Sequence, residues 1–243
     1  MRVRLDTQLV AHGLAESREK AKRLILAGAV RVAGQLAGKP SDLVDEAAPL
    51  TVEAAEKFAS RGGYKLEAAL AAFGIACAAA VCVDIGASTG GFTDCLLQHG
   101  AARVHAVDVG KGQLAWKLRQ DKRVVVHDEV NARNITTEMI GELADVVTMD
   151  VSFISLQKVL PAVVRLLKPG GRLVALIKPQ FEAGRQFVKK GGVVRDAQVH
   201  DRVQAEIVAF ATQTLGLQLI GCIPSPLLGP AGNKEFLIGL IHS

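Results

Sequence analysis

Short apolar segments rich in β-branched residues alternate with helix-like segments over most of the 243-residue chain. The segments expected to be strands are 81–85, 104–109, 124–127, 146–150, 173–178, 217–222 and 235–241. Helix-like stretches at 92–99, 112–119, 134–142 and 155–167 separate the first five, and 197–215 follows the fifth. Such alternation is typical of an α/β fold, in which helices cover both faces of a mostly parallel sheet. We therefore predict a seven-stranded, mostly parallel sheet after residue 60.

The first 40 residues account for the whole net positive charge of the chain. They hold eight basic and three acidic residues, whereas the other 203 residues are neutral and the net charge is +5. Two helices are expected here, the second of them capped by Ser17 and ended by Gly28. The basic residues expected to contact a partner are Arg4, Arg18, Lys20, Lys22 and Arg23. A small basic module on a neutral body indicates a polyanionic partner, most simply nucleic acid, and a solvated helix face is the alternative.

A family resemblance covers roughly residues 2–50. The pattern Arg18-Glu19-x-Ala21-x-x-Leu24-Ile25-x-x-Gly28-x-Val30-x-Val32-x-Gly34 resembles the S4 RNA-binding domain. The resemblance implies a small α+β domain whose basic helix face contacts RNA phosphates, which positions the protein but carries little sequence information. Residues 41–60 are expected to end this module and to connect it to the rest. We therefore expect two domains, 1–59 with the connector and 60–243.

A buried strand runs into a glycine-rich turn at residues 81–92. The ligand-binding residues expected there are Asp84, Gly86, Ser88, Thr89, Gly90 and Gly91. Glycines let the backbone approach a ligand at the carboxyl end of the first strand, where open α/β sheets bind their ligands. The spacing is neither G-x-G-x-x-G nor a P-loop, so a diphosphate cradle is disfavoured. A tight turn without a ligand is the alternative.

Acidic residues also close the next two strands. Asp108 lies about 20 residues beyond the turn, as expected for a carboxylate that holds ribose hydroxyls. Asp128 ends the third strand, and Asn131 follows it at a position suited to read an adenine amino group. Together these residues resemble the S-adenosylmethionine site of Rossmann-like methyltransferases. The resemblance implies S-adenosylmethionine as cofactor, with Asp84 orienting its methionine amino end.

Four ionisable residues lie where a core does not need them: Lys65, Asp150, Lys178 and Glu235. A lysine that closes an apolar strand, as Lys178 does, is otherwise explained by snorkelling. Together they resemble the K-D-K-E tetrad of the FtsJ-type RNA ribose 2′-O-methyltransferases. With the S4-like module, the chain is similar over its full length to the hemolysin A/TlyA family of ribosomal RNA cytidine-2′-O-methyltransferases. The segments that carry this similarity are 60–66, 150–156, 177–182 and 232–236, and Asp128 departs from it because the family more often has glutamate there.

The tetrad suits proton removal from a ribose hydroxyl. That hydroxyl is a poor nucleophile, so it must lose its proton as it attacks a sulfonium methyl. A lysine accepts a proton only in its neutral form, which burial and a second cation favour. The hypothesis is that Lys178 is the general base and Lys65 the neighbouring cation that also steadies the oxyanion. Glu235 positions the lysines, and Asp150 orients Lys178 and adjoins the methyl donor.

A basic segment at 181–195 is expected to be a flexible loop over the active site that grips RNA phosphates. Its basic residues expected to bind RNA are Arg185, Lys189 and Lys190. A merely solvated loop is the alternative. Because the chain has only ten aromatic residues, base stacking on an exposed aromatic sheet is not expected. The expected partners are ribosomal RNA or ribosomal subunits.

Compartment and rival functions follow from what the sequence does not contain. Four cysteines show no C-x-x-C spacing, no apolar leader is visible, and the longest uncharged stretch is shorter than the ~20 residues of a membrane span. We expect a cytoplasmic protein in a reducing compartment, without metal and without membrane contact. Three rivals stay open: a membrane-active hemolysin, a non-catalytic RNA- or ribosome-binding protein, and an enzyme methylating a small-molecule hydroxyl.

Overall fold

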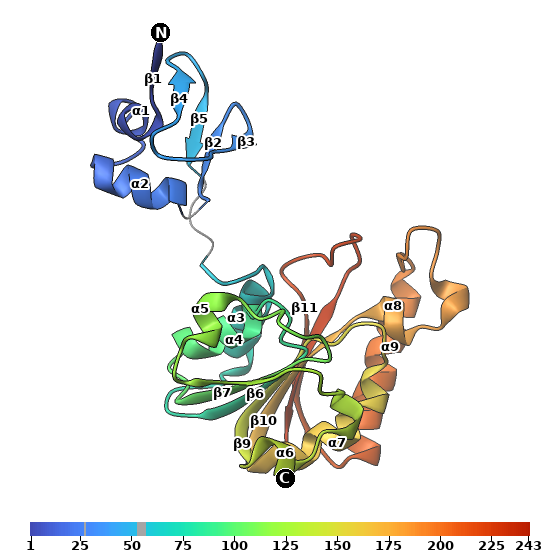
Figure 1. The fold of residues 1–243 in the computed structure, drawn as a ribbon. Coiled ribbons are helices and arrows are strands. Elements are labelled where there is room, and N and C mark those ends of the chain that lie inside the picture. Colours follow the sequence, from blue (N-terminus) through green and yellow to red (C-terminus); the bar gives the residue numbers. More distant parts are fainter. Residues whose placement is uncertain (27, 53–56) are drawn as a thin grey trace. The chain divides into compact units, whose positions relative to one another are not determined.

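The computed structural model describes residues 1–26, 28–52 and 57–243. The chain divides into two compact units, Met1–Lys57 and Phe58–Ser243 (Figure 1). The sequence places the boundary after residue 59, within a connector of which residues 53–56 lie outside the described residues. Phe58 is buried in the apolar core of the second unit, together with Leu66 and Phe92, and therefore belongs to that unit.

The N-terminal unit is a small α+β fold. Its elements are β1 (Arg2–Arg4), α1 (Leu5–Ala11), α2 (Arg18–Leu26), β2 (Val30–Val32), β3 (Gln35–Leu36), β4 (Leu43–Asp45) and β5 (Leu50–Val52). β1 pairs with β4, and β2 lies between β3 and β5, all antiparallel. The apolar faces of the two helices bury Leu5, Leu9, Ala21 and Ile25 in one core. Ser17 caps α2 as expected, because its Oγ accepts from the Lys20 backbone N–H at 3.2 Å.

The second unit alternates strands and helices in the expected order. Its strands are β6 (Val81–Ile85), β7 (Arg103–Val107), β8 (Val124–His127), β9 (Ala144–Met149), β10 (Leu167–Ile177), β11 (Gln218–Pro224) and β12 (Phe236–Ile241). Its α-helices are α3 (Gly62–Phe73), α4 (Gly91–Gln98), α5 (Trp116–Arg119), α6 (Thr137–Ile140), α7 (Leu160–Val163), α8 (Pro179–Glu182) and α9 (Ala197–Ala209). The helix expected over 155–167 is instead three short turns, the 3-10 segments Leu156–Lys158 and Val164–Leu166 flanking α7, with Pro161 in its first turn.

The seven strands form one sheet in the order β11-β12-β10-β9-β6-β7-β8. β10, β9, β6, β7 and β8 run parallel, whereas β12 is antiparallel to both β10 and β11. This confirms the predicted seven-stranded, mostly parallel sheet. The first strand, β6, lies between β7 and β9, so the strand order reverses beside it. Open α/β sheets bind ligands at such a reversal, outside the carboxyl ends of the strands.

Helices cover both faces of the sheet (Figure 1). One core holds Leu66 of α3 and Leu96 of α4 against Cys82 of β6. The other holds Leu160 of α7 and Val203 of α9, with strand residues that include Val83 and Ile85. Successive β6 side chains therefore enter opposite cores, which is why the strand reads as a continuous apolar run. The polar residues of the site lie outside these two cores, at the carboxyl ends of the parallel strands.

All four cysteines lie within the described residues and none of them forms a disulfide. Cys77, Cys82 and Cys95 are buried and Cys222 is half-buried, where burial raises the pKa of its thiol to about 11. Within the described residues, no helix combines the length and the apolar character needed to cross a membrane. The same residues hold no group of three or more His, Cys, Asp and Glu side chains arranged to bind a metal ion.

Candidate active site

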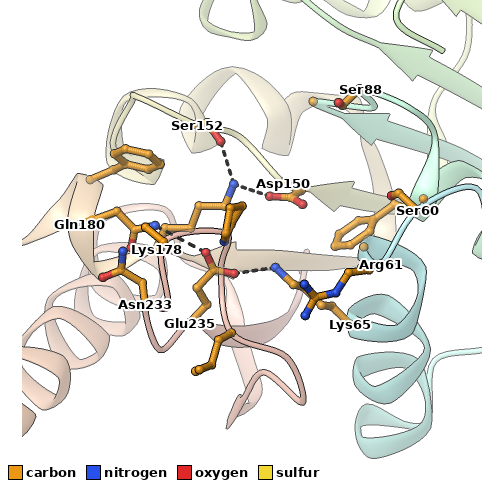
Figure 2. Close-up of a pocket in the computed structure, with 18 of the residues that line it drawn as sticks. Ser60, Arg61, Lys65, Ser88, Asp150, Ser152, Lys178, Gln180, Asn233 and Glu235 are labelled. Atoms are coloured by element: carbon orange, nitrogen blue, oxygen red, sulfur yellow. Dashed lines mark hydrogen bonds and ion pairs between the residues drawn. The ribbon is translucent and has the colours of Figure 1, made fainter. Parts of the chain in front are cut away.

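A cavity of about 660 Å³ lies at the carboxyl ends of β6, β9 and β10. It is lined by all four residues of the predicted tetrad, Lys65, Asp150, Lys178 and Glu235 (Figure 2). Lys65 comes from the first turns of α3, and Asp150 and Lys178 directly follow β9 and β10. Glu235 directly precedes β12, whose antiparallel direction brings its amino end to the edge where the parallel strands end. The topology thus gathers residues that are up to 170 positions apart.

The four residues form two separate ion pairs. The Lys65 Nζ donates to Glu235 Oε2 at 2.6 Å, and the two side chains are only 9% and 1% exposed. The Lys178 Nζ lies 2.6 Å from Asp150 Oδ1 and donates to Ser152 Oγ at 2.8 Å. Asp150 therefore holds Lys178, in the arrangement expected from the sequence. Glu235 contacts Lys65 directly, whereas Lys178 has its own carboxylate.

The glycine-rich turn forms the wall next to Asp150. Gly86, Ser88, Thr89 and Gly91 line the cavity, and Gly90 is buried beside them. A Cβ on Gly86 would lie 2.6 Å from the backbone oxygen of Asp150, and its φ of +81° is in the left-handed region. Only glycine satisfies both conditions, so the turn can approach the end of β9 closely. The backbone N–H groups of Gly86 and Ala87 donate to the Val107 carbonyl, which anchors the turn to β7.

Asp84 is buried beneath this turn and does not line the cavity. Its two carboxylate oxygens accept from Thr93 Oγ1 at 2.7 Å and Thr148 Oγ1 at 3.0 Å. Burial raises the pKa of Asp84 to about 7, although the two hydroxyl donors oppose that shift. In this structure Asp84 ties α4 and β9 to β6. Its carboxylate does not line the cavity, so this geometry does not bring it to the predicted position beside the amino end of a cofactor.

The three predicted nucleoside-binding residues lie outside the cavity lining. Asp108 accepts from the Ser88 and Gly110 backbone N–H groups at 2.8 and 2.7 Å, so it braces the glycine-rich turn. Asp128 pairs with Arg119 of α5, which lowers the pKa of that carboxyl. Asn131 caps the 3-10 segment Ala132–Asn134. Arg119, the partner of Asp128, was not among the residues predicted from the sequence.

Three polar residues complete the site and were not selected from the sequence. Ser152 holds Lys178, and Gln180 Nε2 donates to Glu235 Oε1 at 3.5 Å. Asn233 is buried and links two segments, because its Oδ1 accepts from the Val194 N–H and its Nδ2 donates to the Gly192 carbonyl. Each lies within two residues of a tetrad member, and that proximity is the signal that could have identified them.

Two phenylalanine rings lie at the edge of the cavity. Phe153 is 90% exposed and has a φ of +64°, a conformation that non-glycine residues rarely adopt and that often marks functional sites. Its ring centroid is 5.1 Å from that of Phe181. Both rings also line an adjoining hollow of about 450 Å³ with Ile154, Ser155, Arg133, Lys158 and Gln180. The low aromatic content argued against base stacking on an aromatic sheet, yet three of the ten aromatic residues, Phe92, Phe153 and Phe181, line this cavity.

The basic residues of the N-terminal unit are organised around a buried carboxylate. Arg4 donates to Asp6 through Nε and a terminal nitrogen at 3.0 and 2.9 Å, and Arg18 donates to it at 3.1 Å. Asp6 is fully buried, whereas the two arginine side chains are 43% and 56% exposed. The guanidinium groups hold the pKa of Asp6 far below its usual range. The other predicted RNA-binding residues of this unit, Lys20, Lys22 and Arg23, are exposed on α2.

The segment 181–195 is more ordered than a plain connection. It contains the end of α8, the 3-10 turn Arg185–Phe187 and an antiparallel bridge between Lys189 and Val193. Arg202 of α9 lies over the Phe187 ring at 4.3 Å, and Val194 is buried and bonded to Asn233. The predicted RNA-binding residues Arg185, Lys189 and Lys190 are all exposed on it.

Comparison with known proteins matches each of the two units to a protein family. The FtsJ-like methyltransferase family model matches residues 58–242, and the S4 domain model matches residues 3–48. The chain is 50% identical over 241 residues to a Mycobacterium tuberculosis protein named 16S/23S rRNA (cytidine-2′-O)-methyltransferase TlyA, covering 98% of this chain and 90% of the relative.

Two further relatives carry a different name. A Brachyspira hyodysenteriae protein named hemolysin A is 42% identical over 240 residues, covering 98% of this chain and 100% of the relative. A solved structure described as a hemolysin, from Streptococcus thermophilus, is 43% identical with a TM-score of 0.76 and covers 100% of this chain and 89% of that one. With its S4 domain and its full-length relatives named TlyA and hemolysin A, the chain belongs to the FtsJ-like methyltransferase family.

Proposed function

We propose that this enzyme transfers a methyl group from S-adenosylmethionine to the 2′-hydroxyl of a cytidine in ribosomal RNA. The observation that carries the proposal is the convergence of Lys65, Asp150, Lys178 and Glu235 on one cavity beside a glycine-rich turn. The name of the Mycobacterium tuberculosis relative, which is 50% identical over almost the whole chain, supports the choice of cytidine and of ribosomal RNA. A small-molecule hydroxyl would leave the basic S4 domain without a role.

The residues of the cavity fit S-adenosylmethionine. Gly86 and Gly91 keep the wall free of side chains, and Asp150 presents a carboxylate where a positively charged sulfonium is favoured. Among the described residues, the buried Oδ1 of Asp150 accepts no hydrogen bond and has only its ion pair with Lys178, so it has capacity for a cationic ligand. S-adenosylmethionine supplies, when bound, an electrophilic methyl group on sulfur. Asp108 and Asp128 would bind the nucleoside after releasing Gln113 and Arg119, respectively.

The lysines have different roles in this proposal. Lys178 is the general base: after its ammonium has lost a proton to water, its neutral amine takes the proton of the ribose hydroxyl, and Asp150 and Ser152 hold its Nζ at a defined point in the cavity. Lys65 is the cation that steadies the developing oxyanion, and Glu235 positions it through their buried ion pair. General-base catalysis of this kind contributes a factor of roughly 10² to 10⁴ in rate.

RNA binding is assigned to exposed basic residues and to the aromatic rings of Phe153 and Phe181. Exposed basic residues of the S4 domain and of the segment 181–195 contact phosphates, which positions the substrate. Phe153 and Phe181 offer an apolar surface for an unstacked base near the methyl donor. Because the proposed substrate is ribosomal RNA, as free RNA or in a subunit, we propose that the enzyme acts in the cytoplasm.

A methyl-transfer assay tests the proposal directly. Purified protein, tritiated S-adenosylmethionine and ribosomal RNA or subunits should give labelled RNA with the methyl group on a cytidine ribose. Lys178→Ala should lower turnover by roughly 10² or more and still bind S-adenosylmethionine. Lys168→Ala is the matched control, since Lys168 lies on the same strand and pairs with Asp145 away from the site. Near-normal methylation by Lys178→Ala would contradict the assignment of the base.

Salt dependence tests the RNA-binding assignment. Each phosphate contact that the protein makes releases counterions and makes the slope of log affinity against log salt more negative by about 0.7 to 0.9. The affinity of the full chain for ribosomal RNA should therefore fall steeply as salt rises. A flat dependence would exclude phosphate contacts as the main source of affinity.

A further inference from the structure

Gln180 lies between the cavity and the adjoining hollow and lines both of them. It is in the first turn of α8, directly after Lys178 and Pro179, which follow the end of β10. Its Nε2 donates to Glu235 Oε1 at 3.5 Å. Its Oε1 is buried and accepts no hydrogen bond from the residues that the structure describes.

A buried carbonyl oxygen without a donor is unusual. Removing it from water costs free energy that a native structure normally recovers through a hydrogen bond. Gln180 lines two hollows, so a ligand that enters either of them and draws the amide toward it can supply the missing donor. The mechanism of methyl transfer described above does not use this atom.

The orientation of the amide follows from its neighbours. Glu235 is an acceptor that is already bound to the Lys65 ammonium, so only the NH₂ end of Gln180 can face it favourably. The carbonyl end must then point the other way. Lys65 and Glu235 thus leave the carbonyl oxygen of Gln180 as the end of the amide that is available to accept a hydrogen bond.

The rest of the adjoining hollow suits a nucleobase of matching polarity. Phe153, Phe181 and Ile154 supply apolar surface, and Arg133 and Lys158 supply donors. Ser155 Oγ already accepts from the Gln157 backbone N–H. One acceptor beside cationic donors complements the edge of cytosine, which has an amino donor next to two acceptor atoms. Uracil carries a carbonyl oxygen in place of that amino group and would face the Gln180 carbonyl unfavourably.

We propose that Gln180 is a specificity-determining residue that accepts a hydrogen bond from the exocyclic amino group of the target cytosine. This inference rests on the proposed function, because it requires an RNA nucleotide at the site. The ligand chemistry that Gln180 selects is an amino group on the Watson–Crick edge of a pyrimidine, and the residue itself takes no part in proton or methyl transfer.

The test uses the full-length protein and three RNA substrates. The substrates differ only at the cytidine mapped in the methyl-transfer assay, which is kept, replaced by uridine, or replaced by the ribonucleoside of pyrimidin-2-one, which lacks the amino group. For the wild type, kcat/KM should be roughly 10- to 100-fold higher on cytidine than on either replacement. Equal rates on cytidine and on the pyrimidinone would overturn the inference.

Gln180→Leu removes the acceptor and keeps a side chain of similar size. It should lower kcat/KM on cytidine and reduce the preference over uridine and pyrimidinone to within about threefold, while S-adenosylmethionine affinity and melting temperature stay close to wild type. Gln213→Leu is the matched control, because Gln213 is exposed in the π-helical segment Phe210–Thr214 that follows α9 and lines neither hollow. RNA affinities are measured for all three substrates, so that the preference is available if Gln180→Leu loses turnover.

The outcomes separate this inference from the function it rests on. If the wild type labels no ribosomal RNA, the proposed function fails. If the wild type labels cytidine but Gln180→Leu loses activity on all three substrates with an unchanged preference in rate and affinity, the function stands. In that case Gln180 contacts the ribose or a residue of the site, and its reading of the amino group is overturned.

Discussion

Removing the charge of Glu235 is the sharpest test of how the site is built. Glu235→Gln keeps the shape of the side chain and leaves the Lys65 ammonium without its anion. The Lys65 Nζ lies 2.6 Å from Glu235 Oε2, and 9% and 1% of the two side chains are exposed. Water therefore cannot replace the lost carboxylate without local opening. We expect this single change to lower the stability of the second unit substantially.

The geometry sets the size of the effect. At 2.6 Å and an effective dielectric constant of about 20, the attraction is on the order of 6 kcal/mol, and desolvation of both groups opposes it. Removing one partner of such a buried pair costs about 3–5 kcal/mol, because the other charge stays buried and unpaired. For a unit of this size, that corresponds to a fall in melting temperature of roughly 6–20 °C.

Thermal and urea unfolding measure the effect, and a double variant isolates its cause. Lys65→Met combined with Glu235→Gln removes both charges, so it should recover at least half of the lost stability. Methyl transfer should stay low in the double variant, because the charges that support the reaction are absent. Glu129→Gln is the control, since the Lys111–Glu129 pair is 76% and 64% exposed and its loss should cost less than about 1 kcal/mol.

Two results would refute this reasoning. Unfolding of Glu235→Gln within about 1 kcal/mol of wild type would mean that water reaches the pair despite its burial. A double variant as unstable as Glu235→Gln alone would mean that the cost comes from packing or hydrogen bonding and not from an unpaired charge.

Three further changes test other parts of the molecule. Gly86→Ala places a Cβ 2.6 Å from the Asp150 carbonyl at a positive φ, so calorimetry should show weaker S-adenosylmethionine binding and a stability loss of about 1–3 kcal/mol. Burial raises the pKa of Asp84 to about 7 from an ordinary value of 3.8, so the folded state holds its proton longer than the unfolded state does. The stability of the wild type should therefore fall as pH rises from about 4 to 7, by up to about 1.4 kcal/mol per pH unit, and urea unfolding of Asp84→Asn should lack this fall. Asp6→Asn removes a negative charge beside Arg4, yet it should weaken RNA binding and make the salt dependence less steep in filter-binding assays, because the guanidinium loses the carboxylate that orients it. Tighter binding by Asp6→Asn would show that Asp6 only offsets charge.

Local patterns were sufficient to predict most elements. Strand β6 was predicted with its observed bounds, and so was β8, because an apolar run of β-branched residues bounded by polar ones depends only on neighbours along the chain. Short helices were harder. The segment 155–167 has the composition of a helix, but Pro161 and the return into β10 divide it into three turns.

Sequence alone singled out the four ionisable residues that line the cavity, whereas the tertiary structure decided how they are paired. Lys65 and Glu235 stand out because charges at strand and helix ends next to glycine-rich segments are not needed by a core. That Lys65 pairs with Glu235, and Lys178 with Asp150, depends on the antiparallel direction of β12 and on the order of the strands. Burial and pairing are properties of groups brought together across as many as 170 residues, and no local periodicity encodes them. For the same reason Asp84, which was predicted from the sequence to contact the ligand, is buried under the glycine-rich turn and supports it.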